Sequence, residues 1–391
     1  MIRRIVLLLT AVASSGCFDF DGAYAQFCDG GRCADAGGFI VTGGGGGGIG
    51  PVDAGCPQFL CPQIDWKSPR SSIHYVVAPG LMTESLNRFH VFGSFEANLP
   101  GSANFTHFEY RFVDGGVNTI QRFLDNRTET RQLRGLSMTD YVVTYRIAGK
   151  RYEGSATAVF AGCALPDGGM TDPYQWAVAP VTADEMWFVG YPMSICHWTR
   201  VGGLQATVDP ATGPTVYLQD VYRSPAGDLY VVGGDYVNNV ATGVIVREDG
   251  TPVSHSPTLV DSYYADGFVS IDGTGSLVYA LGRSNSTGQG EIHQLRGDGG
   301  FERVYTAPFR LARLDVMPTG EVWAIGSAFD RVVYFDGGVW ADHLLPTTEF
   351  RGAVFWENVN ATPEGIILTG FETQDDGGRT AIVNTYRRFG Q

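Results

Sequence analysis

The stretch GEVWAIG, residues 320–326, decides the fold class of this 391-residue chain. The residues from Val322 to Ile325 are all apolar and include one large aromatic side chain, Trp323. A middle strand that is buried on both faces needs apolar residues on both, because successive side chains point to opposite sides. We therefore predict a short strand packed between two neighbouring sheets, with Trp323 and Ile325 facing one sheet and the alternate positions facing the other.

Comparable apolar stretches recur along the chain and end in glycine at regular intervals. These glycines are Gly93, Gly190, Gly233, Gly282, Gly326 and Gly370. From Gly190 onward the steps are 43, 49, 44 and 44 residues, and the 97 residues between Gly93 and Gly190 leave room for two steps. The stretch TDYVVTY, residues 139–145, fills the skipped place without a glycine of its own. The sequence therefore predicts a repeat of about 45 residues.

Glycine turns separate the strands within each repeat. Pairs such as Asp249-Gly250, Asp298-Gly299 and Asp336-Gly337 follow the strand after the apolar stretch. Asp-Gly between alternating strands predicts a type I′ hairpin turn, which needs positive φ angles. A second turn often precedes the apolar stretch, as in SPAG at residues 224–227. Residues 216–257 therefore read as four antiparallel strands.

Four antiparallel strands in about 45 residues is the period of a β-propeller blade. From Gly93 onward the pattern resembles kelch-like and WD-like propeller repeats, and Gly233-Gly234 followed by Tyr236 is similar to the double glycine of kelch blades. We predict an all-β fold, a seven-bladed β-propeller; six blades is the alternative if the degenerate second unit is an insertion. The units are 70–125, 126–163, 170–213, 214–258, 259–307, 308–347 and 348–391.

The last unit has only three predicted strands, so its sheet lacks an outer strand. An open ring would expose an unpaired edge. The segment from Gln58 to Trp66 precedes the first unit and is predicted to supply this outer strand, which would join the two ends of the propeller.

The N-terminus reads as an export signal. Arg3 and Arg4 precede an apolar run that is too short to span a membrane, and small residues lead to Cys17. This resembles bacterial lipoprotein signals, which implies a signal peptide over 1–16 and a lipidated Cys17. Phe18 at the next position implies the outer membrane. An ordinary signal peptide cut nearby is the alternative.

Residues 17–55 contain six consecutive glycines and cannot form a packed core, so we predict a disordered Gly/Asp-rich tether ahead of the propeller at 56–391. Six cysteines remain beyond Cys17, and an even number in an exported chain suggests disulfides. The favoured pairs are Cys28–Cys33, Cys56–Cys61 and Cys163–Cys196. A metal site on these cysteines is a weaker reading, because no histidine accompanies them.

Composition limits the function classes. The net charge of −14 argues against nucleic acid, which requires a basic surface. No local catalytic motif, metal-ligand spacing or cofactor fingerprint is present, so no catalytic residue, metal or cofactor is predicted. A propeller can still bring carboxylates together at its axis from separate blades. That arrangement would favour an enzyme acting on a polysaccharide or a small metabolite.

The segments that follow the apolar stretches read as longer polar loops on one face, where binding usually lies. Our binding-face candidates are Glu96, Tyr191, Asp235, Tyr236, Asn285, Glu372, Asp375 and Asp376. We expect a monomer that binds a protein or glycan in the periplasm or at the cell surface and contacts the membrane only through its lipid. A structural subunit of an envelope complex is the remaining alternative.

Overall fold

The computed structural model describes these residues: 59–67, 76–99, 102–114, 116–122, 130–145, 148–153, 156–161, 174–191, 194–206, 216–237, 240–248, 267–283, 289–327, 330–346, 353–373, 375 and 378–388. The predicted signal peptide, Cys17 and the tether lie outside them. Among the described residues no helix is long and apolar enough to cross a lipid bilayer.

The described strands form seven antiparallel sheets, which we number in chain order. The first sheet holds β2 (Val76–Ser85), β3 (Arg88–Leu99), β4 (Ser102–Val113) and β5 (Gly116–Arg122). The second holds β6 (Thr130–Ser137), β7 (Asp140–Tyr145), β8 (Ala148–Glu153) and β9 (Ala156–Ala161). The third holds β10 (Tyr174–Thr182), β11 (Glu185–Tyr191), β12 (Ser194–Thr199) and β13 (Gly203–Ala206).

The other sheets follow the same plan, except that the described part of the fourth has three strands. The fourth sheet holds β14 (Val216–Arg223), β15 (Leu229–Val237) and β16 (Val240–Glu248). The fifth holds β17 (Phe268–Thr274), β18 (Leu277–Arg283), β19 (Gly290–Leu295) and β20 (Phe301–Ala307). The sixth holds β21 (Leu311–Val316), β22 (Val322–Gly326), β23 (Arg331–Phe335) and β24 (Trp340–Leu344). The seventh holds β25 (Ala353–Thr362), β26 (Gly365–Thr373), β27 (Arg379–Arg388) and β1 (Leu60–Lys67).

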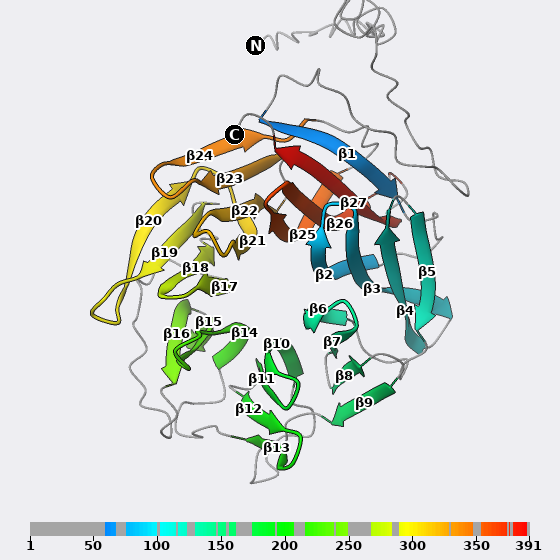
Figure 1. Cartoon of the computed structure of the whole chain (residues 1–391), viewed down its shortest axis with the longest axis horizontal. Helices are drawn as coiled ribbons and strands as arrows, with labels where there is room; N and C mark the ends of the chain where they lie inside the picture. Colours follow the sequence, from blue (N-terminus) through cyan, green and yellow to red (C-terminus); the bar gives the residue numbers. More distant parts are fainter. Residues whose placement is uncertain are drawn as a thin grey trace, which may run out of the picture. The chain divides into compact units, whose positions relative to one another are not determined.

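The sheets stand side by side in a ring, as Figure 1 shows along the ring axis. Their first strands contact one another in chain order, from β2 through β6, β10, β14, β17 and β21 to β25, and β25 contacts β2 again. This arrangement is a β-propeller. The predicted second unit, which the sequence left open as an insertion, forms a four-stranded sheet of its own.

β1 occupies the outer place of the seventh sheet, which the C-terminal part of the chain leaves one strand short. It pairs antiparallel with β27, from Leu60 opposite Arg388 to Lys67 opposite Ile382. An aromatic residue at each end of the segment reaches a neighbouring sheet. Phe59 lies against Trp323 and Tyr334 of the sixth sheet, and Trp66 lies against Tyr110 and Phe112 of the first.

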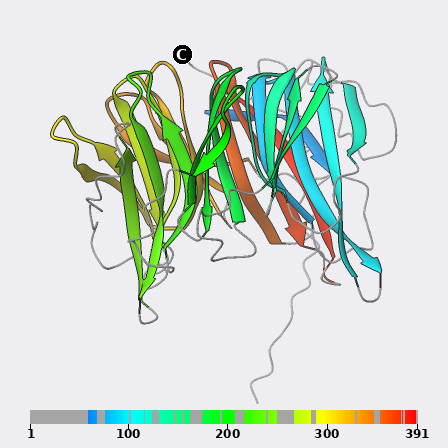
Figure 2. The ribbon, with the colours of Figure 1, turned by 90° about the horizontal axis from the view of Figure 1, so that it is seen from below.

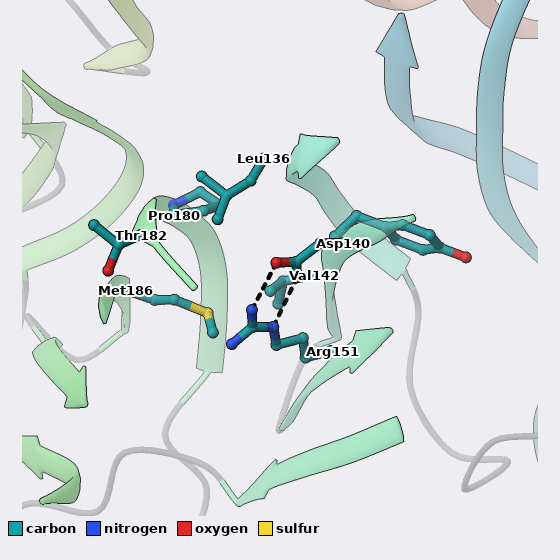
Figure 3. Close-up of a pocket in the computed structure, with 8 residues that line it drawn as sticks. Leu136, Asp140, Val142, Arg151, Pro180, Thr182 and Met186 are labelled. Carbon is teal, nitrogen blue, oxygen red and sulfur yellow. Dashed lines mark hydrogen bonds and ion pairs between the residues drawn. The ribbon is translucent and has the colours of Figure 1, made fainter. Parts of the chain in front are cut away.

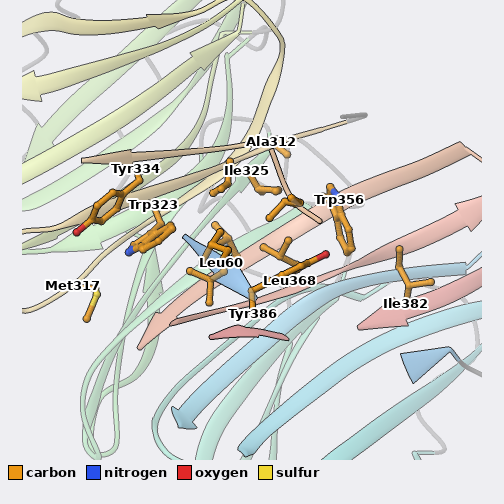
Figure 4. Packing of buried hydrophobic residues seen from close by; sticks show 14 residues of the cluster. Leu60, Ala312, Met317, Trp323, Ile325, Tyr334, Trp356, Leu368, Ile382 and Tyr386 are labelled. Atoms are coloured by element: carbon orange, nitrogen blue, oxygen red, sulfur yellow. The ribbon is translucent and has the colours of Figure 1, made fainter. Parts of the chain in front are cut away.

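The core consists of apolar layers between neighbouring sheets. Trp323 and Ile325 belong to a cluster that faces the seventh sheet, whereas Val322 and Ala324 belong to a cluster that faces the fifth. Figure 4 shows the former cluster, with Leu60 among its members. Burying one such side chain stabilises the fold by about 1.5–3 kcal/mol. The two-sided burial predicted for GEVWAIG is confirmed.

The aromatic residues at equivalent places in other units also pack between sheets. Trp187 clusters with residues of the fourth sheet, Tyr230 with the fifth, and Tyr279 with the sixth. Their predicted role in packing between blades is confirmed.

Two Asp-Gly turns differ from the type I′ prediction, whereas Asp114, which precedes Gly115, has the predicted positive φ, 47°. In the turns at Asp298-Gly299 and Asp336-Gly337 only the glycine has positive φ, 86° and 97°. The aspartate instead accepts backbone hydrogen bonds from residues further along the turn. Asp336 Oδ1 accepts from the N–H groups of Gly338 and Val339, both at 2.8 Å. The aspartate carboxylate therefore completes the turn through these hydrogen bonds. The aspartate residue itself needs no left-handed backbone conformation.

Two of the predicted disulfide cysteines lie among the described residues. Cys61 and Cys196 are fully buried, and both are disulfide-bonded. The predicted partners, Cys56 and Cys163, lie outside the described residues, as do Cys28 and Cys33. The three pairings therefore stay predictions.

Candidate functional site

A β-bulge recurs in the first strand of every sheet, at the edge that lines the ring axis. The register shifts fall between Val77 and Gly80, Thr130 and Gln132, Gln175 and Ala177, Leu218 and Asp220, Phe268 and Ser270, Leu311 and Arg313, and Trp356 and Asn358. A bulge bends the strand and redirects the side chain that follows it. The residues after the bulges form what we call the bulge layer: Gly80, Gln132, Ala177, Asp220, Ser270, Arg313 and Asn358.

Asp220 is the hydrogen-bonding centre of the bulge layer. It is fully buried. Its Oδ1 accepts from Gln132 Nε2 at 2.9 Å and from its neighbour's backbone N–H at 3.0 Å. Its Oδ2 accepts from Ser270 Oγ at 3.2 Å and from the N–H of Ile271 at 3.1 Å, and Arg313 Nη1 lies 3.4 Å away. One carboxylate thus links four sheets.

Two of the contacts of Asp220 join sheets that are not neighbours, and a small residue in the sheet between them leaves the necessary space. Gln132 belongs to the second sheet and reaches Asp220 in the fourth, because the third sheet places Ala177 in the same layer. Arg313 belongs to the sixth sheet and reaches Asp220 past Ser270 of the fifth. The sizes of the residues in the bulge layer therefore complement one another across the axis.

A second layer lies two residues further along each first strand, nearer the short turns. It consists of Met82, Arg134, Ala179, Tyr222, Asp272, Asp315 and Asn360. Asp272 Oδ2 accepts from the N–H of Val316 at 2.9 Å, and Asp315 Oδ2 accepts from the N–H of Ala361 at 2.7 Å. Each carboxyl group therefore bonds to the backbone of the next sheet, as Gln132 Oε1 does to Val178 at 2.8 Å.

The two carboxyl groups of the second layer have raised pKa values. Burial and the nearby Asp272 raise the pKa of Asp315 to about 7, in spite of the hydrogen bond from Ala361 and the charge of Arg134. Burial likewise raises the pKa of Asp272. Burial opposes the charge of Arg134, but Asp220, Asp272 and Asp315 together raise its pKa. We call Arg134, Asp220, Asp272, Arg313 and Asp315 the channel cluster.

The channel cluster was not predicted residue by residue, although the sequence carries a signal for it. In four first strands a polar residue, an apolar residue and another polar residue stand in a row: QLR at 132–134, SID at 270–272, RLD at 313–315 and NVN at 358–360. The apolar middle residues Leu133, Ile271, Leu314 and Val359 are buried between sheets. Polar and apolar residues alternate in these first strands, just before the short turn to the second strand. This alternation would have indicated that the polar side chains are directed to the axis.

No group of three or more His, Cys, Asp or Glu side chains suited to a metal ion occurs within the part of the chain that the structure describes. Burial lowers the pKa values of His107 and His293 to about 4, so both imidazoles are neutral at pH 7.

The predicted binding residues that the structure describes lie toward one face, which we call the loop face because it carries the links between second and third strands. The opposite turn face carries the short turns that join first to second and third to fourth strands. Part of the prediction about long loops is wrong, because several of these segments are extended hairpins. Glu96 in β3 pairs with Phe105 in β4, and Tyr236 in β15 pairs with Ala241 in β16. Backbone pairing continues past the glycine, so Glu96 and Tyr236 belong to strands.

The remaining binding-face candidates differ from one another in burial and in the element to which they belong. Asp235 also lies in β15, and Tyr191 ends β11. Glu372 is 1% exposed and its Oε2 accepts a hydrogen bond from Lys67 Nζ at 3.0 Å, so it joins β26 to β1. Asp375 is exposed. Asn285 and Asp376 lie outside the described residues.

A small crevice opens between the second and third sheets and is shown in Figure 3. Its empty space is about 150 Å³, part of it open to solvent. Arg151 crosses it and donates two hydrogen bonds to Asp140, at 2.8 and 2.7 Å. Ligand pockets usually measure about 300–1,000 Å³. This crevice is a seam between sheets, filled by an ion pair within the second sheet.

Comparison with known proteins supports the fold. No family model and no curated sequence matches this chain. A catalytically inactive virginiamycin B lyase from Staphylococcus aureus with quinupristin is similar in structure, with a TM-score of 0.57 and 10% identity over 82% of this chain and 98% of that one. YCF48 bound to D1 peptide has a TM-score of 0.52 and 12% identity over 82% and 96%. YCF48 from Cyanidioschyzon merolae has a TM-score of 0.51 and 11% identity over 81% and 98%. At these identities the likeness shows the fold alone.

Proposed function

We propose that this chain is an exported outer-membrane lipoprotein, anchored through Cys17, whose propeller binds a protein or glycan partner with its loop face. The observation that carries this proposal is the place where β1 begins. Leu60 lies opposite Arg388, whose N–H donates to the carbonyl of Glu364 in the turn between β25 and β26. The chain therefore enters the propeller on the turn face.

Entry on the turn face gives the two faces different surroundings. A tether of about 40 residues has a root-mean-square reach of about 35 Å, comparable to the width of a propeller. An anchor joined at Leu60 biases the turn face toward the membrane and leaves the loop face free for a partner. Twelve-residue strands β3 and β4 form a long hairpin there, against five residues in β22 and β23. Figure 2 shows that the strands extend to different distances on the loop face.

The paired backbone of these hairpins holds Glu96, Asp235 and Tyr236 on rigid elements, which lowers the entropy cost of binding. A face whose strands carry both acidic and aromatic residues suits either a polar protein surface or a sugar. YCF48, one of the similar propellers, was solved with a bound peptide.

The test compares two variants of the full-length lipoprotein. One is the double change Asp235→Ala and Tyr236→Ala on the loop face; the matched control is Val339→Ala, an exposed residue of a turn. Binding to peptidoglycan, to a glycan array and to cross-linked envelope proteins is measured for both. We expect the loop-face variant to bind at least tenfold more weakly and the control to bind normally. Equal binding by both variants would contradict the proposed face. A Cys17→Ser protein that stays in the membrane fraction would contradict the anchor.

A propeller enzyme remains the second candidate, and one observation favours it. Asp220, Asp272 and Asp315 converge on the axis from three neighbouring sheets, and the pKa of Asp315 is raised to about 7, a range suited to acid–base chemistry. Their hydrogen bonds to backbone N–H groups support a structural role instead. Turnover of envelope polysaccharides that disappears in Asp315→Asn, with the fold intact, would favour the enzyme.

A further inference from the structure

Asp272 and Asp315 occupy matching places on β17 and β21, the first strands of the fifth and sixth sheets. Each lies two residues beyond the bulge layer. Asp272 accepts the N–H of Val316 from the sixth sheet, and Asp315 accepts the N–H of Ala361 from the seventh. Both carboxyl groups are therefore part of the contact between consecutive sheets.

Asp272 accepts from the N–H of Val316, the residue after Asp315, so the two carboxyl groups lie close together, and Asp272 helps to raise the pKa of Asp315. Ionised carboxylates offer only acceptors, so a hydrogen bond between two of them requires a proton on one. Two like charges so close would otherwise repel, and one of the pair keeps its proton to a higher pH than an isolated carboxyl group. One proton shared by the two neighbouring carboxyl groups removes this repulsion.

Charge balance within the channel cluster agrees with this. The charges of Asp220, Asp272 and Asp315 raise the pKa of Arg134 on β6. Arg313, on the same strand as Asp315, is directed to Asp220 and donates to the carbonyl of Val269 at 3.1 Å. On β14, Asp220 and Tyr222 lie near Asp272. Two guanidinium groups and three carboxyl groups are balanced when one carboxyl group is protonated.

We infer that Asp272 and Asp315 form a proton-dependent clamp between the fifth and sixth sheets, closed while the pair shares a proton and weakened when the proton is lost. The native state keeps this proton to a higher pH than the unfolded chain. Its stabilising effect is therefore complete in acid, declines as the pH rises from about 4 and is lost above about 7. Above that pH, repulsion between the carboxylates acts on β17, β21 and the β25 backbone bonded to Asp315.

The experiment uses the purified full-length chain and four proteins: wild type, Asp315→Asn, Asp272→Asn, and Asp298→Asn as a control in an exposed turn. Asparagine can still donate a hydrogen bond to the remaining carboxylate without any need for a proton. Melting temperatures are measured between about pH 5 and about pH 8. We expect wild type and Asp298→Asn to lose several degrees over this range, and Asp315→Asn to lose clearly less.

A local measurement separates the clamp from general pH effects. Hydrogen exchange of the Val316 and Ala361 amides is followed at the same pH values, corrected for the intrinsic rise in exchange rate and compared with amides of β7. In wild type we expect the protection of both amides to fall at least threefold as the pH rises, and in Asp315→Asn to stay constant. The same pH dependence in wild type and Asp315→Asn, by melting or by exchange, would overturn the inference. If Asp315→Asn does not fold, Asp272→Asn provides the same comparison.

Discussion

Glu321 Oε1 accepts a hydrogen bond from Arg388 Nη1 at 2.9 Å, and so the first charged residue of GEVWAIG is tied to the end of the last described strand. Tyr334 Oη donates to the same carboxylate oxygen at 2.6 Å. The ion pair is largely buried, with 9% and 14% of the two side chains exposed. It joins the sixth sheet to the seventh beside the point where β1 enters.

We expect Glu321→Gln to lower the free energy of unfolding by about 2–3 kcal/mol, because removing one partner leaves a buried guanidinium without its counter-charge. Urea denaturation followed by fluorescence measures the loss. Arg388→Met serves as the partner change, and the double variant should lose less than the two single losses combined. Additive losses would show that the pair is not coupled.

The same variant should reveal a pH dependence. Although burial opposes it, hydrogen bonds from Tyr334 and Arg388 lower the pKa of Glu321 below its usual value. A carboxylate with a lowered pKa adds stability above its unfolded-state pKa and loses it as the pH falls through the folded-state value. The difference between wild type and Glu321→Gln should therefore be largest near neutral pH and shrink toward about pH 3. A constant difference across this range would contradict the assignment.

Asp220→Ala should be among the most destabilising single changes in the propeller. The substitution removes the acceptor for Gln132, Ser270 and Ile271 and the ion-pair partner of Arg313. Breaking a buried pair in this way costs about 3–5 kcal/mol. Asp220→Asn keeps the shape and part of the hydrogen bonding, so a smaller loss is expected. Thermal unfolding of both variants tests the order.

The glycine that closes each repeat should differ in importance between sheets. A Cβ on Gly370 would lie 2.1 Å from the carbonyl oxygen of Phe355, a backbone atom that cannot move aside. On Gly326 the closest atoms would be 3.2 Å away. We expect Gly370→Ala to cost about 1–3 kcal/mol and Gly326→Ala clearly less. Equal melting temperatures for the two variants would show that the seventh sheet relaxes around the added methyl group.

Phe59→Ala should weaken the junction between β1 and the sixth sheet. The ring of Phe59 lies 4.3 Å from that of His343 and 5.2 Å from that of Tyr334, between centroids. Losing this partly buried aromatic contact should cost about 1–2 kcal/mol. Limited proteolysis near the N-terminus, together with the melting temperature, measures the effect. Trp66→Ala, at the other end of β1, is the matched comparison for the first sheet.

Much of the fold could be predicted from the sequence because the relevant forces are local and repeat. The two-sided burial of Trp323 and the strand order within each sheet follow from apolar period and turn residues. A missing outer strand in the last unit follows from counting, and the segment before the first unit was the part of the chain left to fill it.

Less of the candidate site could be predicted from the sequence. The channel cluster combines residues from four sheets, and no short motif contains more than two of its members. The extended hairpins carrying Glu96 and Tyr236 were read as loops, because their polar residues hide the continuation of backbone pairing. Glu372 was read as a surface residue, although Lys67, 305 positions earlier, covers it.

The sequence by itself determined the type of unit, because a strand with apolar residues on both sides can be stable only between two sheets. Only the tertiary structure decided which charged groups meet at the axis. These contacts depend on the bulge in each first strand and on small residues such as Ala177 and Ser270. The small side chains leave space for side chains from more distant sheets to reach one another. A contact between residues 88 positions apart, such as Gln132 and Asp220, exists only once the ring has closed.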